Sequence, residues 1–340
     1  ENREIDKIIK RWMYLSSVRE VGWIKEFTPT YFKSSKVFKR YLGQIKNAKF
    51  SPDGTKIVSS SWDATIKIWD IESGDVIKEL KGHTDRVNDA QFSFDGTTIV
   101  SCSHDNTIRL WDVQSGIEIK TLEGHTEAVT SIDISPDGRF IVSGSKDENI
   151  KLWYVQSGQI YETVYIGSSV HDVKFSSNGR DIIVASNWEL KMLDLALIER
   201  VSSDNKSIGI GTHDLFERVI KTRNENTVMK MHNFCDSRNY FVASCLETGT
   251  IQISDIASGT TQYLNTYLAG ASDIKYFPDG KTIVACLTDH TIRLWDPRSG
   301  EEIQELKGHS GPITSVAVSR NGNAIVSCSQ DGTIRLWTPF

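Results

Sequence analysis

Three sets of residues in this sequence contain the side-chain types of a hydrolase triad. Each set has a histidine, a serine, an aspartate and a tryptophan at the same relative spacing: His83, Ser101, Asp105 and Trp111; His125, Ser143, Asp147 and Trp153; and His309, Ser327, Asp331 and Trp337. A Ser-His-Asp triad needs an exposed nucleophile beside an oxyanion site. One such arrangement is enough for an enzyme, so the repetition favours a structural role and predicts no catalytic residue.

Other motifs with known chemistry are missing from the sequence. It has no phosphate-binding loop, metalloprotease motif, dinucleotide fingerprint, calcium loop or nucleophile elbow. The remaining histidines have no metal-ligand spacing: His104, His171, His213, His232 and His290. We therefore expect a non-enzyme without a cofactor or metal site.

Charge and cysteine usage narrow the class of protein further. The 340 residues carry 39 Lys plus Arg and 44 Asp plus Glu, a net charge of −5, so no overall basic field attracts nucleic acid. The five cysteines form no CxxC pair and are interpreted as core residues of a reducing compartment: Cys102, Cys235, Cys245, Cys286 and Cys328. With no apolar run as long as a membrane span, the sequence predicts a cytoplasmic or nuclear protein.

A repeat explains why the polar sets recur. Five tryptophans follow one another at spacings of 42, 42, 142 and 42 residues: Trp69, Trp111, Trp153, Trp295 and Trp337. Two decayed copies fill the long gap, with Leu193 and Ser254 at the tryptophan position, which makes seven copies. Each copy contains short period-two runs rich in Val, Ile and Thr, separated by Asp-Gly or Ser-Gly. Such runs are typical of four-stranded antiparallel sheets, which must pack on one another around an axis.

These features resemble the WD40 repeat family. The resemblance rests on Gly-His at 82–83, 124–125 and 308–309, followed at fixed offsets by the Asp turn and Trp-Asp, and it covers residues 36–340. It implies an all-β, seven-bladed propeller in which each polar set forms a buried hydrogen-bond chain from Asp through His and Ser to the indole. It also implies a platform that binds peptides or other proteins. Because blades four to six lack most of the polar set, we expect them to be less stable than the others.

The segments outside the regular repeat are predicted as follows. Residues 36–42 align with Asp75–Lys81 and should supply the outer strand that closes the ring. In this alignment the loop that follows is three residues shorter than in the other repeats and has Gln44 at the histidine position. Residues 204–227 are interpreted as a long inter-blade loop with a short helix over 215–220. Residues 1–35 form an extension, in which Ile5, Ile8, Ile9, Trp12 and Leu15 share one face of an amphipathic helix. The helix is compatible with packing on the ring, with an origin in an upstream domain, with docking to a partner, and with weak binding to a membrane surface through its basic face.

The resemblance also indicates where a partner binds. Transferred by register, the top-face positions include Trp62, Arg86, Asn88, His104, Lys146 and His171. This sector is basic and aromatic and suits an acidic or phosphorylated peptide. A structural alternative is that Trp62 caps the shortened first loop.

Two functions are compatible with these features. The first is a non-catalytic scaffold, built on a ring that is itself monomeric. The second is a peptide-recognition module of a larger assembly, such as a ubiquitin ligase or a sensor protein.

Overall fold

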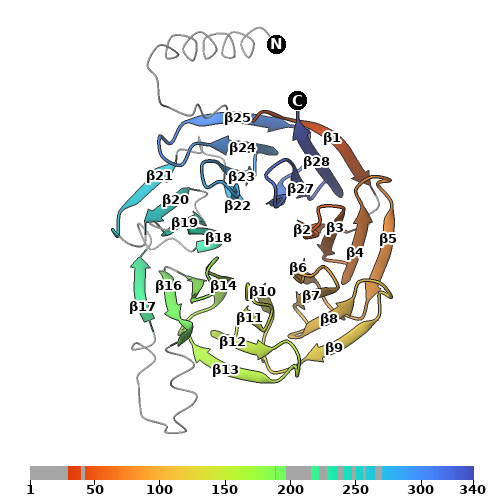
Figure 1. Ribbon diagram of the computed structural model, residues 1–340, viewed down its shortest axis with the longest axis vertical. Coiled ribbons are helices and arrows are strands. Elements are labelled where there is room, and N and C mark those ends of the chain that lie inside the picture. The colour runs from red at the N-terminus through yellow and green to blue at the C-terminus, as the bar shows by residue number, and fades with distance from the viewer. Residues whose placement is uncertain are drawn as a thin grey trace. The chain divides into compact units, whose positions relative to one another are not determined.

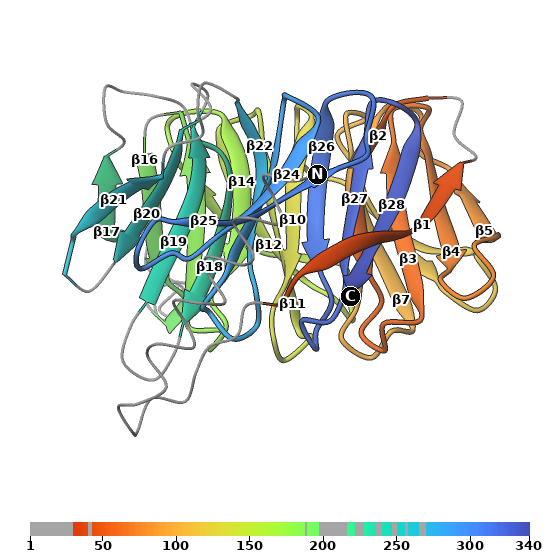
Figure 2. The same cartoon turned by 90° about the horizontal axis from the view of Figure 1, so that it is seen from above.

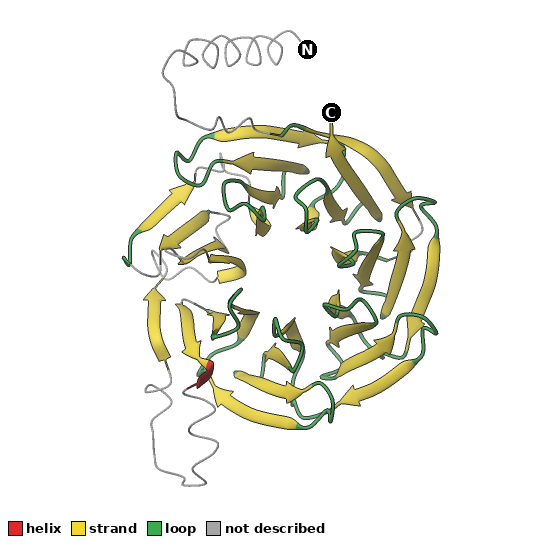
Figure 3. Ribbon diagram, viewed as in Figure 1, coloured by secondary structure: helices red, strands yellow, loops and turns green. Residues whose placement is uncertain are grey.

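The computed structural model describes residues 30–39, 43–187, 189–196, 216–221, 228–235, 240–246, 250–255, 258–264 and 270–340. Within residues 32–340, these segments form seven four-stranded antiparallel sheets arranged around an axis. Nearly all regular structure in the described residues is strand, as Figure 3 shows. The predicted all-β, seven-bladed propeller is confirmed.

Three blades follow the repeat closely. Blade 1 contains β2 (Ile45–Phe50), β3 (Lys56–Ser61), β4 (Thr65–Asp70) and β5 (Val76–Lys81). Blade 2 contains β6 (Val87–Phe92), β7 (Thr98–Ser103), β8 (Ile108–Asp112) and β9 (Glu118–Leu122). Blade 3 contains β10 (Val129–Ile134), β11 (Phe140–Ser145), β12 (Asn149–Tyr154) and β13 (Ile160–Tyr165).

The other four blades include the decayed copies and the closure. Blade 4 contains β14 (Val170–Phe175), β15 (Asp181–Ser186), β16 (Glu189–Asp194) and β17 (Phe216–Lys221). Blade 5 contains β18 (Val228–Cys235), β19 (Tyr240–Leu246), β20 (Ile251–Asp255) and β21 (Thr261–Leu264). Blade 6 contains β22 (Ala271–Tyr276), β23 (Ile283–Leu287), β24 (Thr291–Trp295) and β25 (Glu302–Lys307). Blade 7 contains β26 (Ile313–Val318), β27 (Ile325–Ser329), β28 (Thr333–Pro339) and the N-terminal β1 (Phe32–Lys39).

The hydrophobic core is divided among the seams between neighbouring blades. Between blades 1 and 2, for example, Ile66 and Leu80 pack against Val87, Phe92 and Trp111. The first strand of each blade lies nearest the axis and the fourth lies outermost (Figure 1). No blade buries both of its faces alone, so every blade depends on its two neighbours.

The N-terminal strand closes the ring, as expected, but its bounds differ from the prediction. The closing strand is Phe32–Lys39 rather than 36–42, and it runs alongside β28 (Figure 2). Phe38 faces Ile334 in the same way that Leu80 faces Ile66. Phe38 and Ile45 are seven residues apart, as are Leu80 and Val87, so the first loop has full length. The prediction took Gly43 as the glycine that follows the outer strand, which displaced the predicted closing strand by three residues.

The insertion in blade 4 also differs from the prediction. Residues 216–221 form β17, the outer strand of that blade, so 204–227 is not an inter-blade loop and its predicted helix is wrong. The extra residues lie between β16 and β17, within the blade. A short apolar run such as FERVIK fits a strand as well as a helix, and periodicity alone does not separate the two. The predicted N-terminal helix lies outside the described residues.

Candidate functional site

The top face carries the loops before each first strand and the turns between the second and third strands. A backbone hydrogen bond joins these two elements in each of five blades: Trp62 N to Gln44 O at 3.0 Å, His104 N to Arg86 O at 2.9 Å, Lys146 N to Ala128 O at 3.0 Å, Thr288 N to Gly270 O at 2.8 Å, and Gln330 N to Pro312 O at 2.9 Å. The residue before the turn aspartate is therefore held beside the residue that immediately precedes the first strand. These bonds show that Gln44 corresponds to Arg86, so the prediction that it occupies the histidine position is wrong. The histidine position of blade 1 is residue 41, which lies outside the described residues.

The structure brings together the four side chains of each His–Ser–Asp–Trp set. In blade 2, His83 Nδ1 is 2.8 Å from Asp105, its Nε2 is 2.8 Å from Ser101 Oγ, and Trp111 Nε1 donates to the same oxygen at 2.9 Å. Blades 3 and 7 repeat this chain with separations of 2.8–2.9 Å. The carboxylate accepts from Nδ1–H, so the histidine ring carries its proton on Nδ1 and Nε2 accepts from the serine hydroxyl. Every polar side-chain atom of this hydrogen-bond chain therefore has a partner.

The buried sets are not arranged as hydrolase triads. The three serines, Ser101, Ser143 and Ser327, have no exposed surface and cannot meet a substrate. Burial lowers the pKa of His125 and His309, although their aspartate partners act to raise it. Burial would raise the pKa of Asp331, but hydrogen bonds from Thr333, Ser310 and His309 outweigh it and lower the pKa to about 2. These pKa directions favour a neutral histidine beside a charged aspartate, so the sets hold the loops against the strands.

Trp62 and Arg86 form the most prominent exposed contact of the top face. The Trp62 side chain is 38% exposed, and the Arg86 guanidinium carbon lies 4.6 Å from the centre of its ring. Trp62 comes from blade 1 and Arg86 from blade 2, so the stack bridges two blades. Since the first loop has full length, the interpretation of Trp62 as the cap of a shortened loop no longer applies. A stacked guanidinium keeps its edge N–H groups free for a carboxylate or phosphate.

Two further residues, His104 and Lys146, lie in the same sector. His104 is partly buried, and its Nδ1 has no hydrogen-bond partner among the described residues. Burial lowers the pKa of His104, and Lys146, Arg86 and Lys46 lower it further. Lys146 is exposed. We refer to Trp62, Arg86, His104 and Lys146 as the basic sector.

The other two predicted positions have hydrogen-bond partners within the ring. Asn88 is buried, and its amide donates to the Val129 carbonyl of blade 3 at 2.7 Å. His171 Nε2 lies 3.0 Å from the Asn187 side-chain oxygen within blade 4. We therefore leave both residues out of the proposed binding surface.

Asn88 belongs to a series of inter-blade contacts that the sequence did not reveal. Each first strand has a bulge after its first residue. In four blades the side chain of the bulged residue bonds the next blade. Thr130, Ser272 and Thr314 occupy this position and donate to the first-strand carbonyls of Val170, Ile313 and Ile45, respectively. In blade 1 the same position is Lys46.

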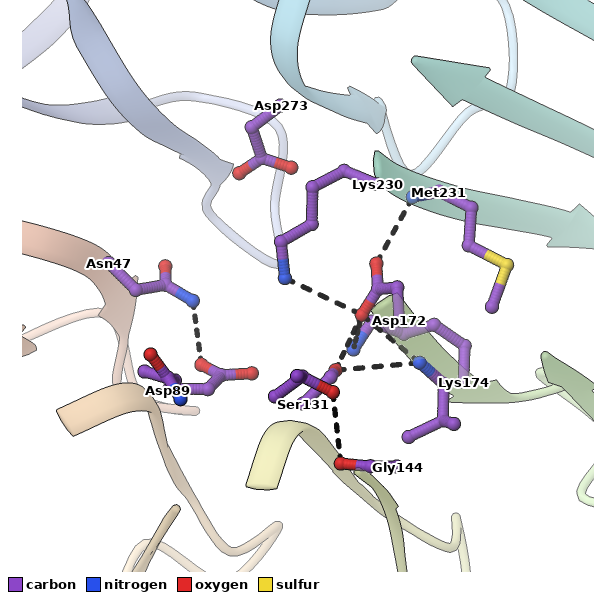
Figure 4. Close-up of polar contacts among 12 residues, drawn as sticks. Asn47, Asp89, Ser131, Gly144, Asp172, Lys174, Lys230, Met231 and Asp273 are labelled. Carbon is purple, nitrogen blue, oxygen red and sulfur yellow. Dashed lines mark hydrogen bonds and ion pairs between the residues drawn. The ribbon is translucent and has the colours of Figure 1, made fainter. Parts of the chain in front are cut away.

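A second layer of polar residues surrounds the axis below the bulges. We call it the axial network; it consists of Asn47, Asp89, Ser131, Asp172, Lys230, Asp273 and Ser315. Figure 4 shows Asp172 accepting from Ser131 and the Met231 backbone, with the Lys174 and Lys230 ammonium groups each 3.6 Å away. Asp89 pairs with Lys49 at 2.7 Å and accepts from Asn47 at 2.6 Å.

Asp273 completes this layer. It pairs with Lys275 at 2.7 Å and accepts from Ser315 of blade 7 at 2.8 Å. Burial would raise the pKa of Asp172, but Lys174 and Lys230 outweigh it and hold that pKa below its usual range. The network therefore links neighbouring blades through charged groups that are paired and hydrogen-bonded.

The described residues offer neither a metal site nor a membrane-spanning helix. They contain no cluster of three or more His, Cys, Asp or Glu that could hold a metal ion. No helix among them is long and apolar enough to cross a membrane.

Comparison with known proteins identifies the family. A family profile described as WD domain, G-beta repeat matches residues 32–70, 74–112, 116–154, 262–296 and 300–338, more than half of the chain. The chain belongs to the WD40 family. These matches place residue 32 in register with residues 74 and 116, which agrees with the observed closing strand. WD40 propellers bind other proteins and typically serve as interaction scaffolds.

Three similar proteins illustrate the range of WD40 relatives. The chain is 26% identical over 170 residues to Autophagy-related protein 16 of Arabidopsis thaliana, covering 47% of this chain and 33% of that protein. It is 31% identical over 86 residues to Guanine nucleotide-binding protein subunit beta of Arabidopsis thaliana, covering 24% of this chain and 23% of the relative. It is 25% identical over 97 residues to human Angio-associated migratory cell protein, covering 28% of this chain and 22% of that protein. The matches span a third or less of each relative.

Proposed function

We propose that this WD40 propeller is a non-catalytic scaffold whose basic sector binds an acidic segment of a partner protein. The observation that carries the proposal is the Trp62–Arg86 stack, in which a large apolar ring and a guanidinium share one exposed site. Trp and Arg are the residue types most often found at binding hot spots. Lys146 adds positive charge to a chain whose net charge is −5. The sector thus combines an aromatic surface with charge complementarity to Asp, Glu or phosphorylated residues.

Single substitutions in the sector test the proposal. We expect Trp62→Ala and Arg86→Glu each to reduce capture of the main cellular partner by at least tenfold, because each removes a central anchor. The melting temperature should change little, since both side chains lie on the surface. Affinity purification with quantitative mass spectrometry measures capture, and thermal melting measures stability.

Matched controls separate the sector from the rest of the ring. Gln330→Ala changes the blade 7 position that corresponds to Trp62, and Arg298→Glu reverses an exposed charge in a turn at the opposite end of blade 6. Both controls should retain the partner. If Trp62→Ala and Arg86→Glu recover the same proteins as the wild type, the partner binds another surface and the proposal is wrong.

A recognition module within a larger assembly is a second candidate. It is supported by membership of a family whose propellers bind other proteins. In such an assembly the same sector would present a peptide to an attached or associated enzyme, for example in a ubiquitin ligase or a sensor protein. Identification of a stoichiometric enzyme in the native complex would favour this function over a simple scaffold.

We also propose that the protein resides in a reducing compartment such as the cytoplasm. Cys102, Cys245, Cys286 and Cys328 are buried free thiols. Burial raises the pKa of Cys328 to about 12, which keeps that thiol protonated and unreactive. Imaging of a fluorescently tagged full-length protein tests this location.

A further inference from the structure

Exposed apolar side chains gather at one edge of blade 2. Apart from the C-terminal Phe340, the three most exposed large apolar residues that the structure describes are Phe94, Ile117 and Ile119, which are 54%, 67% and 54% exposed. Phe94 lies in the turn between β6 and β7, and the two isoleucines flank the first residue of β9, the outer strand of the blade (Figure 1). We call these three residues the rim patch.

Two members of the rim patch differ from the residues at the same position in other blades. Phe94 follows the residue that accepts from the turn glycine, and its equivalents in the described turns are Pro52, Pro136, Ser177, Pro278 and Arg320. The Ile117 carbonyl accepts from Asp112 N at 2.9 Å, and the residues that accept in the same way elsewhere are Asp75, Gln159, Thr260 and Glu301. Both turns therefore form without a large apolar side chain, so turn geometry does not explain Phe94 or Ile117.

The rim patch lies at the end of blade 2 opposite the top face. The turn that carries Phe94 is joined to the turn that precedes Ile117 by a hydrogen bond from Val113 N to Thr97 O at 2.9 Å. Ile119 occupies the bulge between β9 and β8. The corresponding Ile303 of blade 6 is buried in a core, whereas no member of the rim patch belongs to the cores on either side of blade 2. The patch is therefore an exposed surface and not part of the packing between blades.

Two carboxylates border the rim patch, and each keeps one oxygen available. Asp95 Oδ1 accepts from Ser93 Oγ and Thr97 N, and Asp112 Oδ1 accepts from the backbone and hydroxyl of Ser115. Neither Oδ2 atom accepts a hydrogen bond from the residues that the structure describes. The hydrogen bonds, above all those from Ser93 and Ser115, lower the pKa of both aspartates. Each aspartate thus presents a charged oxygen to an incoming donor.

The turns around the rim patch carry net negative charge. Residues 93–98 and 112–117 of blade 2, together with 51–56 and 70–75 of blade 1, contain six acids against one lysine, a net charge of −5. Two lysines of neighbouring outer strands reach these turns: Lys36 donates to the Ile71 carbonyl at 3.0 Å, and Lys78 packs beside Gly116. With both lysines counted, the net charge is still −3. The surroundings of the apolar patch therefore favour a cationic partner.

We propose that the rim patch docks a segment of a partner protein in which apolar side chains are flanked by Lys or Arg. The apolar residues of the segment cover Phe94 and the two isoleucines, and the flanking cations pair with Asp95 and Asp112. The rim patch lies at the other end of the blade from the basic sector and has the opposite charge, so the two surfaces take different segments. This inference goes beyond the proposed acidic-segment function, and either one can fail while the other stands.

Four libraries of immobilised, degenerate dodecapeptides test the chemistry of the segment. The first combines positions of mixed Leu, Ile, Phe and Trp with positions of Lys. The second and third replace Lys with Glu or Ser, and the fourth keeps Lys but replaces the apolar positions with Ser. The full chain should bind the first library at least tenfold more tightly than each of the others, because only that library supplies both kinds of contact. Equal or tighter binding of any other library would overturn the proposal.

Substitutions that copy other blades locate the surface. Phe94→Ser and Ile117→Gln introduce the residues found at Ser177 and Gln159, so the turns should form and the melting temperature should change little. Each substitution should weaken binding of the first library at least tenfold, because each removes an exposed apolar anchor. Pro278→Ser makes a similar change in the same turn of blade 6 and should retain the wild-type affinity. Full affinity in either rim-patch variant would show that the segment binds elsewhere.

A charge substitution tests the role of the aspartates. Asp95→Asn copies Asn178 of blade 4 and keeps the turn, so it should lower the preference for the Lys library over the Ser library by about threefold, as expected for one exposed ion pair. Asp279→Asn in blade 6 is the matched control and should keep the preference. If Asp95→Asn also keeps it, Asp95 does not pair with the segment and the charge assignment is wrong.

Two further measurements separate this inference from its alternatives. Trp62→Ala should leave binding of the first library unchanged, and loss of binding in that variant would move the site to the basic sector and overturn the inference. Sedimentation of the full chain without peptide tests a second copy as the occupant. A dimer of the wild type that becomes a monomer in Phe94→Ser would assign the rim patch to self-association, and the assignment to a basic segment would be wrong.

Discussion

The buried polar side chains of this propeller form two layers with different structural roles. The His–Ser–Asp–Trp sets connect strands within one blade, and they recur at fixed spacing, so they stand out in the sequence. The axial network connects different blades. Asp172, for example, accepts from Ser131 and lies within 3.6 Å of Lys230. Lys174 lies in the same strand as Asp172, but Ser131 and Lys230 belong to other repeats, so sequence spacing does not show these contacts.

The charge of Asp172 should contribute strongly to stability. Asp172→Asn leaves Lys174 and Lys230 without the acid that they share, and breaking a buried ion pair in this way should cost about 3 kcal/mol. Guanidinium chloride unfolding at pH 7 measures the loss. Asp279→Asn is the matched control, because Asn178 and Asn321 already occupy the equivalent turn position; its effect should stay within about 0.5 kcal/mol.

The effect of Asp172→Asn should depend on pH with a definite sign. The pKa of Asp172 is lower in the folded chain than its unfolded value of about 3.9, so its stabilising charge is fully present above that value. The contribution is lost as the pH falls toward the folded pKa. The stability difference between wild type and Asp172→Asn should therefore shrink below about pH 4, and a constant difference down to pH 3 would contradict a charge-based origin.

At the scale of the strand, the sequence predicted inner elements better than outer ones. First to third strands carry the Asp-Gly turns and the tryptophan, whose positions repeat clearly. Outer strands contain few apolar residues, and their defining feature is one buried residue seven positions before the next blade, such as Leu80 or Phe38. The alignment by Gly43 did not use this spacing, so the predicted closing strand was displaced from β1 by three residues. In blade 4 the residue that corresponds to Leu80 is Ile220, eight positions before Val228, so this spacing does not locate β17.

The seam between blades 4 and 5 should be the least stable in the ring. Its described core contains no aromatic residue: Ile183, Ala185, Leu190, Met192, Val228, Met231, Val242 and Leu246. The seam between blades 1 and 2, in contrast, contains Phe92 and Trp111. Blade 5 also buries the side-chain oxygen of Gln252, Oε1, without a hydrogen-bond partner among the described residues. Native-state hydrogen exchange should show faster opening of β15 and β19 than of β3 and β7.

The central strands of the other blades serve as internal references for this measurement. Among them, β3, β7 and β15 have the same length and similar burial, so differences in intrinsic exchange are small beside differences in opening. Equally slow exchange in all seven blades would mean that the axial network, which includes Asp172 and Lys230, compensates for the missing aromatic residues.

At the scale of the whole ring, one strand holds the circle closed. β1 pairs with β28 from Phe32 to Lys39 and buries Phe38 between blades 7 and 1. Phe32 is buried in the neighbouring core between blades 6 and 7, where its backbone exchanges two hydrogen bonds with the Gln304 side chain. β1 thus contributes to two of the seven seams, although it is only one outer strand.

Removal of β1 should therefore destabilise the entire ring and not blade 7 alone. A chain lacking residues 1–39 loses Phe32 and Phe38, each worth about 3–5 kcal/mol in a core, and leaves β28 as an unpaired edge. Since each blade depends on both neighbours, we expect either loss of cooperative unfolding or a fall of more than about 10 °C in melting temperature. A chain lacking only residues 1–29 keeps β1 and is the control. Equal melting temperatures for the two truncated chains would show that the circle is held by the seams alone and that β1 is dispensable.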